Sequence, residues 1–188
     1  QPSAIIGDAA PCSGMPGIVY SVTNVAGLSY NWSVPAGWTI TAGQNTNSIT
    51  VNVGTAGGTV SVTPSSACGT GPVQILAVSV GAVPAQPMIT GNIAPCIGST
   101  EIYSVTSVAG EIYNWTVPTG SSITAGQGTA SISVSIGSLN GNITVVPQNT
   151  CGLGTYQNLA IMPAAQVTPG IDIGTAPGVC DGTSVSFN

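Results

Sequence analysis

The sequence predicts an all-β protein built from tandem sandwich domains, and three observations support this fold class. Apolar residues alternate with polar ones in short stretches such as 48–53, where Ile49, Val51 and Val53 share one face. This is the period of a half-buried strand. Turn signals rich in glycine and proline separate such stretches at a spacing typical of sandwiches and barrels. No stretch has a helical period, and no apolar run approaches the roughly 18 residues that favour a membrane span.

The strands fall into a unit that the chain contains more than once. The motifs at 20–23, 30–32 and 40–44 return 83 residues later at 103–106, 113–115 and 123–127. A further copy begins near Cys180. A repeat of this length indicates an array of small domains. We therefore expect one repeat at 1–82, a second at 83–165 and the N-terminal strands of a third at 166–188, arranged head to tail in a fragment of a longer array.

Within the first repeat we expect strands at 3–6, 18–23, 30–34, 38–41, 48–53, 59–63 and 73–80. About seven strands in a domain of this size match an immunoglobulin-like sandwich. Aromatic and valine side chains at the middle of the second and third expected strands should form the core. In the two repeats these are Tyr20, Val22 and Trp32, and then Tyr103, Val105 and Trp115.

Several strings in the first repeat resemble a known family. They are PCSG at 11–14, VYSV at 19–22, YNWSVPAGW at 30–38, SITV at 48–51 and ACG at 67–69. They resemble the PKD-like, immunoglobulin-like repeats that occur in tandem in very large secreted surface proteins of Bacteroidota. Gliding-motility adhesins and other cargo of the type 9 secretion system are among these proteins. The resemblance implies an extracellular stalk or adhesive module without catalysis.

The charge balance excludes several functions. The chain has no Lys, Arg or His, and its net charge of −5 comes from five scattered acids. These are Asp8, Glu101, Glu111, Asp172 and Asp181. Binding to phosphate backbones or to anionic membranes needs cationic side chains, so we expect neither partner and no membrane insertion. The chain has many hydroxyl groups but no His or Lys that could act as a base to activate them. We therefore expect no enzyme and no cofactor.

Five cysteines fall into two classes. Cys12, Cys96 and Cys180 precede the second strand of their repeats, whereas Cys68 and Cys151 lie at a hairpin tip. Recurring cysteines indicate disulfides in an oxidising compartment.

In the expected topology the two cysteine positions of one repeat lie at opposite ends, about 17 Å apart, whereas a disulfide needs Cα atoms within about 7 Å. We therefore favour an interdomain Cys12–Cys151 bond over Cys12–Cys68, with free thiols as a third alternative. Cys68 would then bond to a preceding repeat and Cys96 to a following one.

We expect a structural repeat segment, a stalk or filament, of a large cell-surface adhesin. Its partners are neighbouring repeats of the same chain, with lateral self-association or surface polysaccharide as further candidates. The alternative function is a glycan-binding module that uses an exposed aromatic residue, for which Trp38 is the candidate. A calcium site between domains is a weaker alternative, because calcium takes six to eight oxygens and Asp8 and Asp172 each stand alone.

Overall fold

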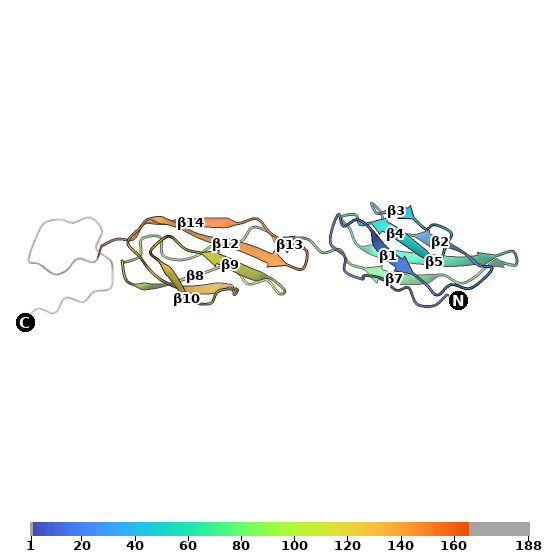
Figure 1. Ribbon diagram of the computed structural model, residues 1–188, viewed down its shortest axis with the longest axis horizontal. Coiled ribbons are helices and arrows are strands. Elements are labelled where there is room, and N and C mark those ends of the chain that lie inside the picture. Colours follow the sequence, from blue (N-terminus) through green and yellow to red (C-terminus); the bar gives the residue numbers. More distant parts are fainter. Residues whose placement is uncertain (1, 166–188) are drawn as a thin grey trace, which may run out of the picture. The chain divides into compact units, whose positions relative to one another are not determined.

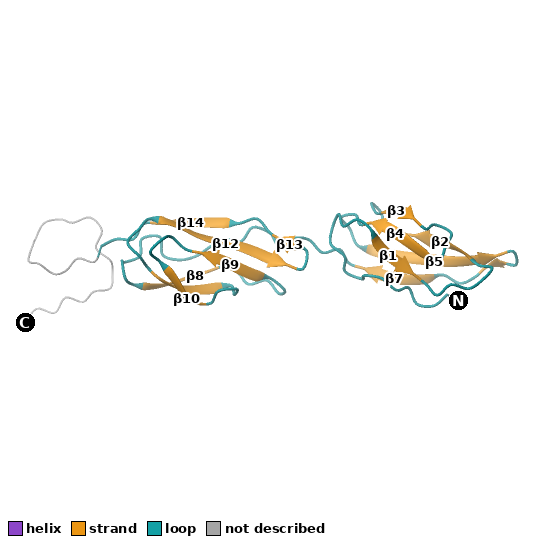
Figure 2. Cartoon of the chain, viewed as in Figure 1, coloured by secondary structure: helices purple, strands orange, loops and turns teal. Residues whose placement is uncertain are grey.

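The computed structural model of the protein describes residues 2–165, which fold into two units. The first unit spans Gln1–Ala82 and the second begins at Val83 (Figure 1). The described residues form fourteen strands and no helix (Figure 2). The all-β class is therefore confirmed. Among these residues no helix is long and apolar enough to cross a membrane. The expected third repeat lies outside the described residues.

The first unit is a sandwich of two antiparallel sheets. Its strands are β1 (Ile18–Ser21), β2 (Ser29–Ser33), β3 (Thr39–Ala42), β4 (Ser48–Asn52), β5 (Gly58–Ser66), β6 (Gly69–Thr70) and β7 (Gln74–Val78). In one sheet β4 lies between β1 and β3. In the other, β5 pairs with β2 on one side and with β6 and β7 on the other. The long strand β5 therefore organises one half of the sandwich.

The second unit repeats this topology strand for strand. Its strands are β8 (Thr100–Ser104), β9 (Ile112–Thr116), β10 (Ser122–Ala125), β11 (Ser131–Ser135), β12 (Gly141–Asn149), β13 (Gly152–Leu153) and β14 (Gln157–Ile161). The first sheet has the order β10–β11–β8, and in the second β12 pairs with β9, β13 and β14. The internal sequence repeat is thus also a structural one.

The start of each unit differs from the sequence expectation. The expected strand at 3–6 is reduced to one bridge, in which Ile6 and Ser21 exchange backbone hydrogen bonds of 2.8 and 2.9 Å. The backbone at Gly7 then passes directly over the ring of Tyr20, where a side chain would collide with the ring. After this ring the chain leaves β1, and residues 9–13 bond to residues 79–81 instead.

The expected strand at 59–63 is longer than predicted and contains a proline. β5 continues through Pro64 to Ser66, and Pro64 lies opposite Tyr30 of β2. A proline in a paired strand normally removes a ladder hydrogen bond. Here β7 pairs with β5 only as far as Val62, and beyond that point the Pro64 carbonyl accepts a hydrogen bond from Gly71. The missing N–H therefore leaves no partner unpaired in the ladder.

Each unit has its own core between the two sheets. The residues expected there are all buried: Tyr20, Val22 and Trp32 in the first, and Tyr103, Val105 and Trp115 in the second. The indole nitrogens of Trp32 and Trp115 donate hydrogen bonds to the carbonyl oxygens of Thr46 (2.8 Å) and Thr129 (2.9 Å). Burying each large apolar side chain contributes about 1.5–3 kcal/mol, and the indole hydrogen bond fixes its orientation.

Candidate functional site

The described carboxylates are engaged in local hydrogen bonds. Asp8 accepts from the backbone of Ala10 at 2.9 Å. Glu101 accepts from the hydroxyl of Ser99, and Glu111 from that of Tyr113, each at 2.9 Å. No group of three or more potential metal ligands occurs in the part of the chain that the structure describes. Asp172 and Asp181 lie outside it. The arrangement of Asp8, Glu101 and Glu111 supports turns rather than acid–base chemistry.

Two buried tyrosines have shifted ionisation. Burial, with a smaller contribution from the charge of Asp8, raises the pKa of Tyr20 to about 12. Burial and the charge of Glu101 raise the pKa of Tyr103 to about 12 as well. Each hydroxyl donates to a backbone carbonyl in the segment before the first strand, Tyr20 to Asp8 at 2.6 Å and Tyr103 to Asn92 at 2.9 Å. These phenols therefore act as neutral donors that fasten the start of each unit.

Trp38 does not form the exposed platform that a glycan contact requires, and this expectation is wrong. Its side chain is only 7% exposed, and its ring centroid lies 6.3 Å from that of Tyr20. Its indole nitrogen donates to the carbonyl oxygen of Ala56 at 2.9 Å. The tight turn at Gly37, which has a φ of 82°, directs the chain so that Trp38 folds over the core. A buried ring with a satisfied N–H cannot stack on a sugar.

The segment with Cys12 lies at the end where the first unit terminates. Cys12 forms a parallel bridge with Gly81, and the amide of Ser13 donates to the Gly81 carbonyl at 2.8 Å. Two further bonds, from Ser79 to Ala9 (2.9 Å) and from Gly81 to Pro11 (3.0 Å), complete a short parallel ladder. We call this region the linker end. The second unit repeats it with Cys96 and Ala164.

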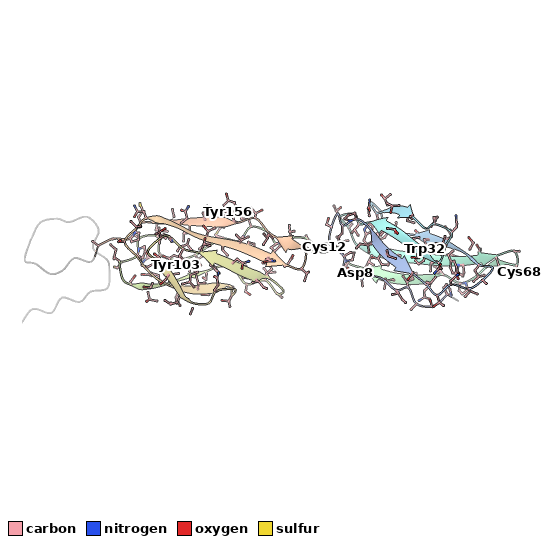
Figure 3. The ribbon with its side chains drawn as sticks, in the orientation of Figure 1. Asp8, Cys12, Trp32, Cys68, Tyr103 and Tyr156 are labelled. Atoms are coloured by element: carbon pink, nitrogen blue, oxygen red, sulfur yellow. The ribbon has the colours of Figure 1, made fainter. Side chains whose placement is uncertain are left out.

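The other cysteines lie at the tip of the longest hairpin of each unit. Cys68 lies in the turn between β5 and β6, and Cys151 in the turn between β12 and β13. Gly69 and Gly152 follow these cysteines with φ values of 128° and 130°, which side chains rarely adopt. We call this region the hairpin end. In the first unit Cys12 and Cys68 lie at opposite ends of the sandwich (Figure 3).

The cysteines differ in chemical state. Cys12, Cys96 and Cys151 are disulfide-bonded, whereas Cys68 is a free, exposed thiol. Cys12 is therefore not bonded to Cys68. Cys180 lies outside the described residues.

One contributor to the hairpin end was missed from the sequence. In the second unit, the segment directly after Ala82 lies against the hairpin. A Cβ on Gly154 would approach Pro84 Cβ and Pro147 Cγ, each at 2.9 Å, and one on Gly152 would lie 3.5 Å from Val83 Cγ1. The two glycines that face Val83 and Pro84 were the available signal in the sequence.

A family model described as a PKD-like domain matches residues 1–78 and again residues 82–161. An I-band fragment of titin aligns with a TM-score of 0.51 and 13% identity, covering 88% of this chain and 66% of that one.

Another titin fragment aligns with a TM-score of 0.50 and 13% identity, covering 86% of this chain and 67% of that one. FdeC, an Escherichia coli adhesin, aligns with a TM-score of 0.49 and 16% identity, covering 87% of this chain and 66% of that one. Such low identities show the fold alone, and the chain spans about two thirds of the length of each of these structures. No curated protein sequence matches it.

Proposed function

The chain belongs to the family of PKD-like domains, and from this premise we propose that it is a non-catalytic structural segment of a large secreted cell-surface adhesin. In this proposal the repeats form a stalk or filament outside the cell. Attachment or gliding motility is the process served, and the type 9 system is the export route, as the sequence resemblance suggests. Disulfide-bonded cysteines suit an oxidising compartment. The partners of each repeat are its neighbours in the same chain.

The observation that carries the proposal is the pattern of cysteine states at the linker end and the hairpin end. Cys12 and Cys151 are both disulfide-bonded, while Cys68 is free. We propose that Cys12 and Cys151 are bonded to each other and clamp the two repeats together. Such a bond would make the junction resist bending and extension, which is what a stalk requires.

Chain connectivity supports this pairing. Cys12 is paired with Gly81 within the first unit, and Gly152 faces Val83 within the second. Because Gly81 and Val83 are two residues apart, their Cα atoms lie within about 7.6 Å of each other. The chain thus leads from one cysteine segment directly to the other. A disulfide needs Cα atoms within about 7 Å, and so short a connection allows the two cysteines to approach each other that closely.

The bond would also change how the chain carries tension. Pulled from its termini, the backbone would pass tension from Cys12 through the disulfide to Cys151, and residues 13–150 would be bypassed. Their unfolding would then add no length. In the reduced chain, by contrast, tension would pass through residues 13–150, and the parallel ladder between 9–13 and 79–81 would be loaded in shear. The disulfide therefore favours a segment that keeps its length under load.

The test combines a disulfide map with single-molecule pulling of the full chain. Proteolysis under non-reducing conditions should release a peptide pair joined through Cys12 and Cys151. Under force, the reduced chain should extend about 460–500 Å further than the oxidised chain, at 3.3–3.6 Å for each bypassed residue. The double variant C12S/C151S should match the reduced chain. Equal extension of the oxidised and reduced chains would reject the clamp.

A further inference from the structure

The hairpin end of the first unit contains a hollow that its own residues leave open. Its volume is about 280 Å³, and it is lined by Leu28, Pro64, Ser65, Ser66, Cys68, Gly69, Thr70 and Gly71. We call it the hairpin hollow. The free thiol of Cys68 therefore lies at the edge of a preformed depression beside Pro64 and Gly71, rather than on a featureless turn.

The same place in the second unit is occupied. Pro147 and Gly154 correspond to Pro64 and Gly71, and Pro84 lies against both of them. At Gly71, by contrast, the three atoms nearest to an added Cβ all belong to Pro64, at 3.0, 3.7 and 3.8 Å. In the second unit this place therefore holds Pro84 of the segment that directly follows Ala82.

The hairpin cysteines of the two units differ in the same way. Cys151, beside the occupied hollow, is disulfide-bonded, and Cys68, beside the open one, is free. We propose that the hairpin hollow is a docking site for another repeat of this type, which would insert its Val-Pro linker between Pro64 and Gly71 and bond its linker-end cysteine to Cys68. The first unit is then a socket for array extension. This inference rests on the proposed stalk function and deepens it by naming the partner and its contacts.

The covalent step requires an oxidant, for which a low-molecular-weight disulfide such as oxidised glutathione suffices. The Cys68 thiolate attacks the small disulfide, forming a mixed disulfide and releasing one thiol. The incoming cysteine, as its thiolate, then displaces the second glutathione and forms the protein disulfide. Overall, two protein thiols are oxidised and one molecule of oxidised glutathione is reduced to two thiols. Prior docking of the linker would place the incoming cysteine near Cys68 and direct this exchange.

The experiment adds a repeat ahead of the first unit. Residues 1–84, with their own Cys68 changed to Ser, are joined ahead of Gln1 of the full chain, so that the added Val83-Pro84 linker can enter the first hairpin hollow. Both chains are oxidised with glutathione, labelled with a maleimide and mapped by mass spectrometry. In the unextended chain the Cys68 peptide should carry the label or a single glutathione, but no second peptide. In the extended chain it should carry neither and appear joined to the added Cys12.

Two variants of the extended chain separate docking from disulfide formation. With the added Cys12 changed to Ser, Cys68 should label severalfold more slowly than in the unextended chain, because the docked linker covers it. With G71A, the new side chain should occupy the place of the incoming proline and reduce the yield of the cross-link severalfold. G71A in the unextended chain provides the control for folding.

The outcomes distinguish this inference from the proposed function. If Cys68 labels equally fast in both chains and forms no cross-link while the original Cys12–Cys151 peptide is present, the docking site is rejected and the clamped stalk stands. If that original peptide is also absent, both proposals are rejected. A cross-link to Cys68 whose yield is unaffected by G71A would reject the hollow as the seat of the linker.

Discussion

Trp38 in the first repeat and Ser121 in the second occupy the same place, directly before the third strand of their units, yet they hold that strand differently. The Trp38 indole nitrogen donates to Ala56 at 2.9 Å, whereas the Ser121 hydroxyl accepts from the amide of Gly137 at 2.9 Å. Both connect the same two segments, one with a large buried ring and the other with a small hydroxyl. Such differences lie outside the shared core, in which Trp32 and Trp115 make matching contacts.

The comparison teaches that the repeat constrains its centre more than its periphery. Burial and indole hydrogen bonding at Trp32 and Trp115 are the same in both units. The hairpin ends, in contrast, differ in thiol state and in what lies against the glycine at 71 or 154. A stalk module needs one core, whereas its ends depend on which neighbour is present. The predictions below test where that division lies.

The largest expected difference comes from replacing Trp38 by Ser, which makes the first repeat resemble the second at this position. The loss of a buried ring should destabilise the first unit by about 3–5 kcal/mol, as for other Trp truncations in cores. Denaturant unfolding of the reduced chain, followed by far-UV circular dichroism, measures the change. The matched variant S121A loses one hydrogen bond and should cost about 0.5–1.5 kcal/mol. Equal effects of the two changes would show that Trp38 is peripheral to the core.

A smaller difference is expected between the two hairpin glycines. G154A should destabilise the second unit by about 1–3 kcal/mol, the usual cost of overpacking, because its side chain would press on Pro84 and Pro147. G71A meets only Pro64 and should cost less than about 1 kcal/mol. Thermal unfolding of each single variant beside the parent chain measures both effects. If G71A proved as costly as G154A, the hollow of the first unit would not be open to a linker.

Both units should lose stability at alkaline pH, despite their different acidic neighbours. The pKa values of Tyr20 and Tyr103 are raised from 10.0 to about 12. Between pH 10 and 12 the unfolded state therefore binds fewer protons than the folded state, and stability falls as pH rises. The tyrosine contribution is complete below pH 10 and lost as pH passes 12. Denaturation midpoints of the reduced chain between pH 9 and 12 measure this decline.

Two substitutions assign that pH dependence to residues. Y20F should remove the decline caused by Tyr20 in the first unit. Y103F should remove only part of the decline in the second unit, because burial also raises the pKa of Tyr113 there. D8N introduces the residue found at the matching position 92, and it should lower the pKa of Tyr20 modestly, since burial is the larger cause of its shift. A decline that persists unchanged in Y20F would assign the dependence to other groups.

The sequence allowed the centre of each repeat to be predicted, and the reasons are physical. Period-two alternation reports which side chains face a core, so the burial of Tyr20 and Trp32 could be expected. Trp38 was open to misinterpretation because its exposure depends on a turn and on Ala56, which no periodicity encodes. The hairpin hollow could not be predicted either, since glycine and proline at 71 and 84 are interpreted first as turn residues. The role of these residues becomes apparent only once the fold brings distant segments of the chain together.

A further predicted effect of modest size concerns the open edges of β2 and β9, because the chain has no lysine to protect them. Here a glutamine takes the place of a neighbouring strand. The Gln44 side-chain amide accepts from the Trp32 backbone N–H at 3.3 Å and donates to its carbonyl at 3.1 Å, and Gln127 makes the same pair with Trp115 at 3.2 and 3.1 Å. An exposed strand edge invites pairing with another chain, and these amides satisfy that edge internally.

Replacing either glutamine by alanine should therefore cost about 1 kcal/mol in its own unit, because two backbone hydrogen bonds of modest net value are lost. Gln44 also donates to Asn31 at 3.0 Å, so Q44A should have a slightly larger effect than Q127A. The double variant should associate more readily than the parent chain, as measured by sedimentation velocity at several concentrations. Q44E is the matched control, because its carboxylate can accept from the Trp32 N–H but cannot donate to the carbonyl. It should lie between the parent and Q44A in stability, and if it equalled the parent, the edge carbonyl would not need a donor.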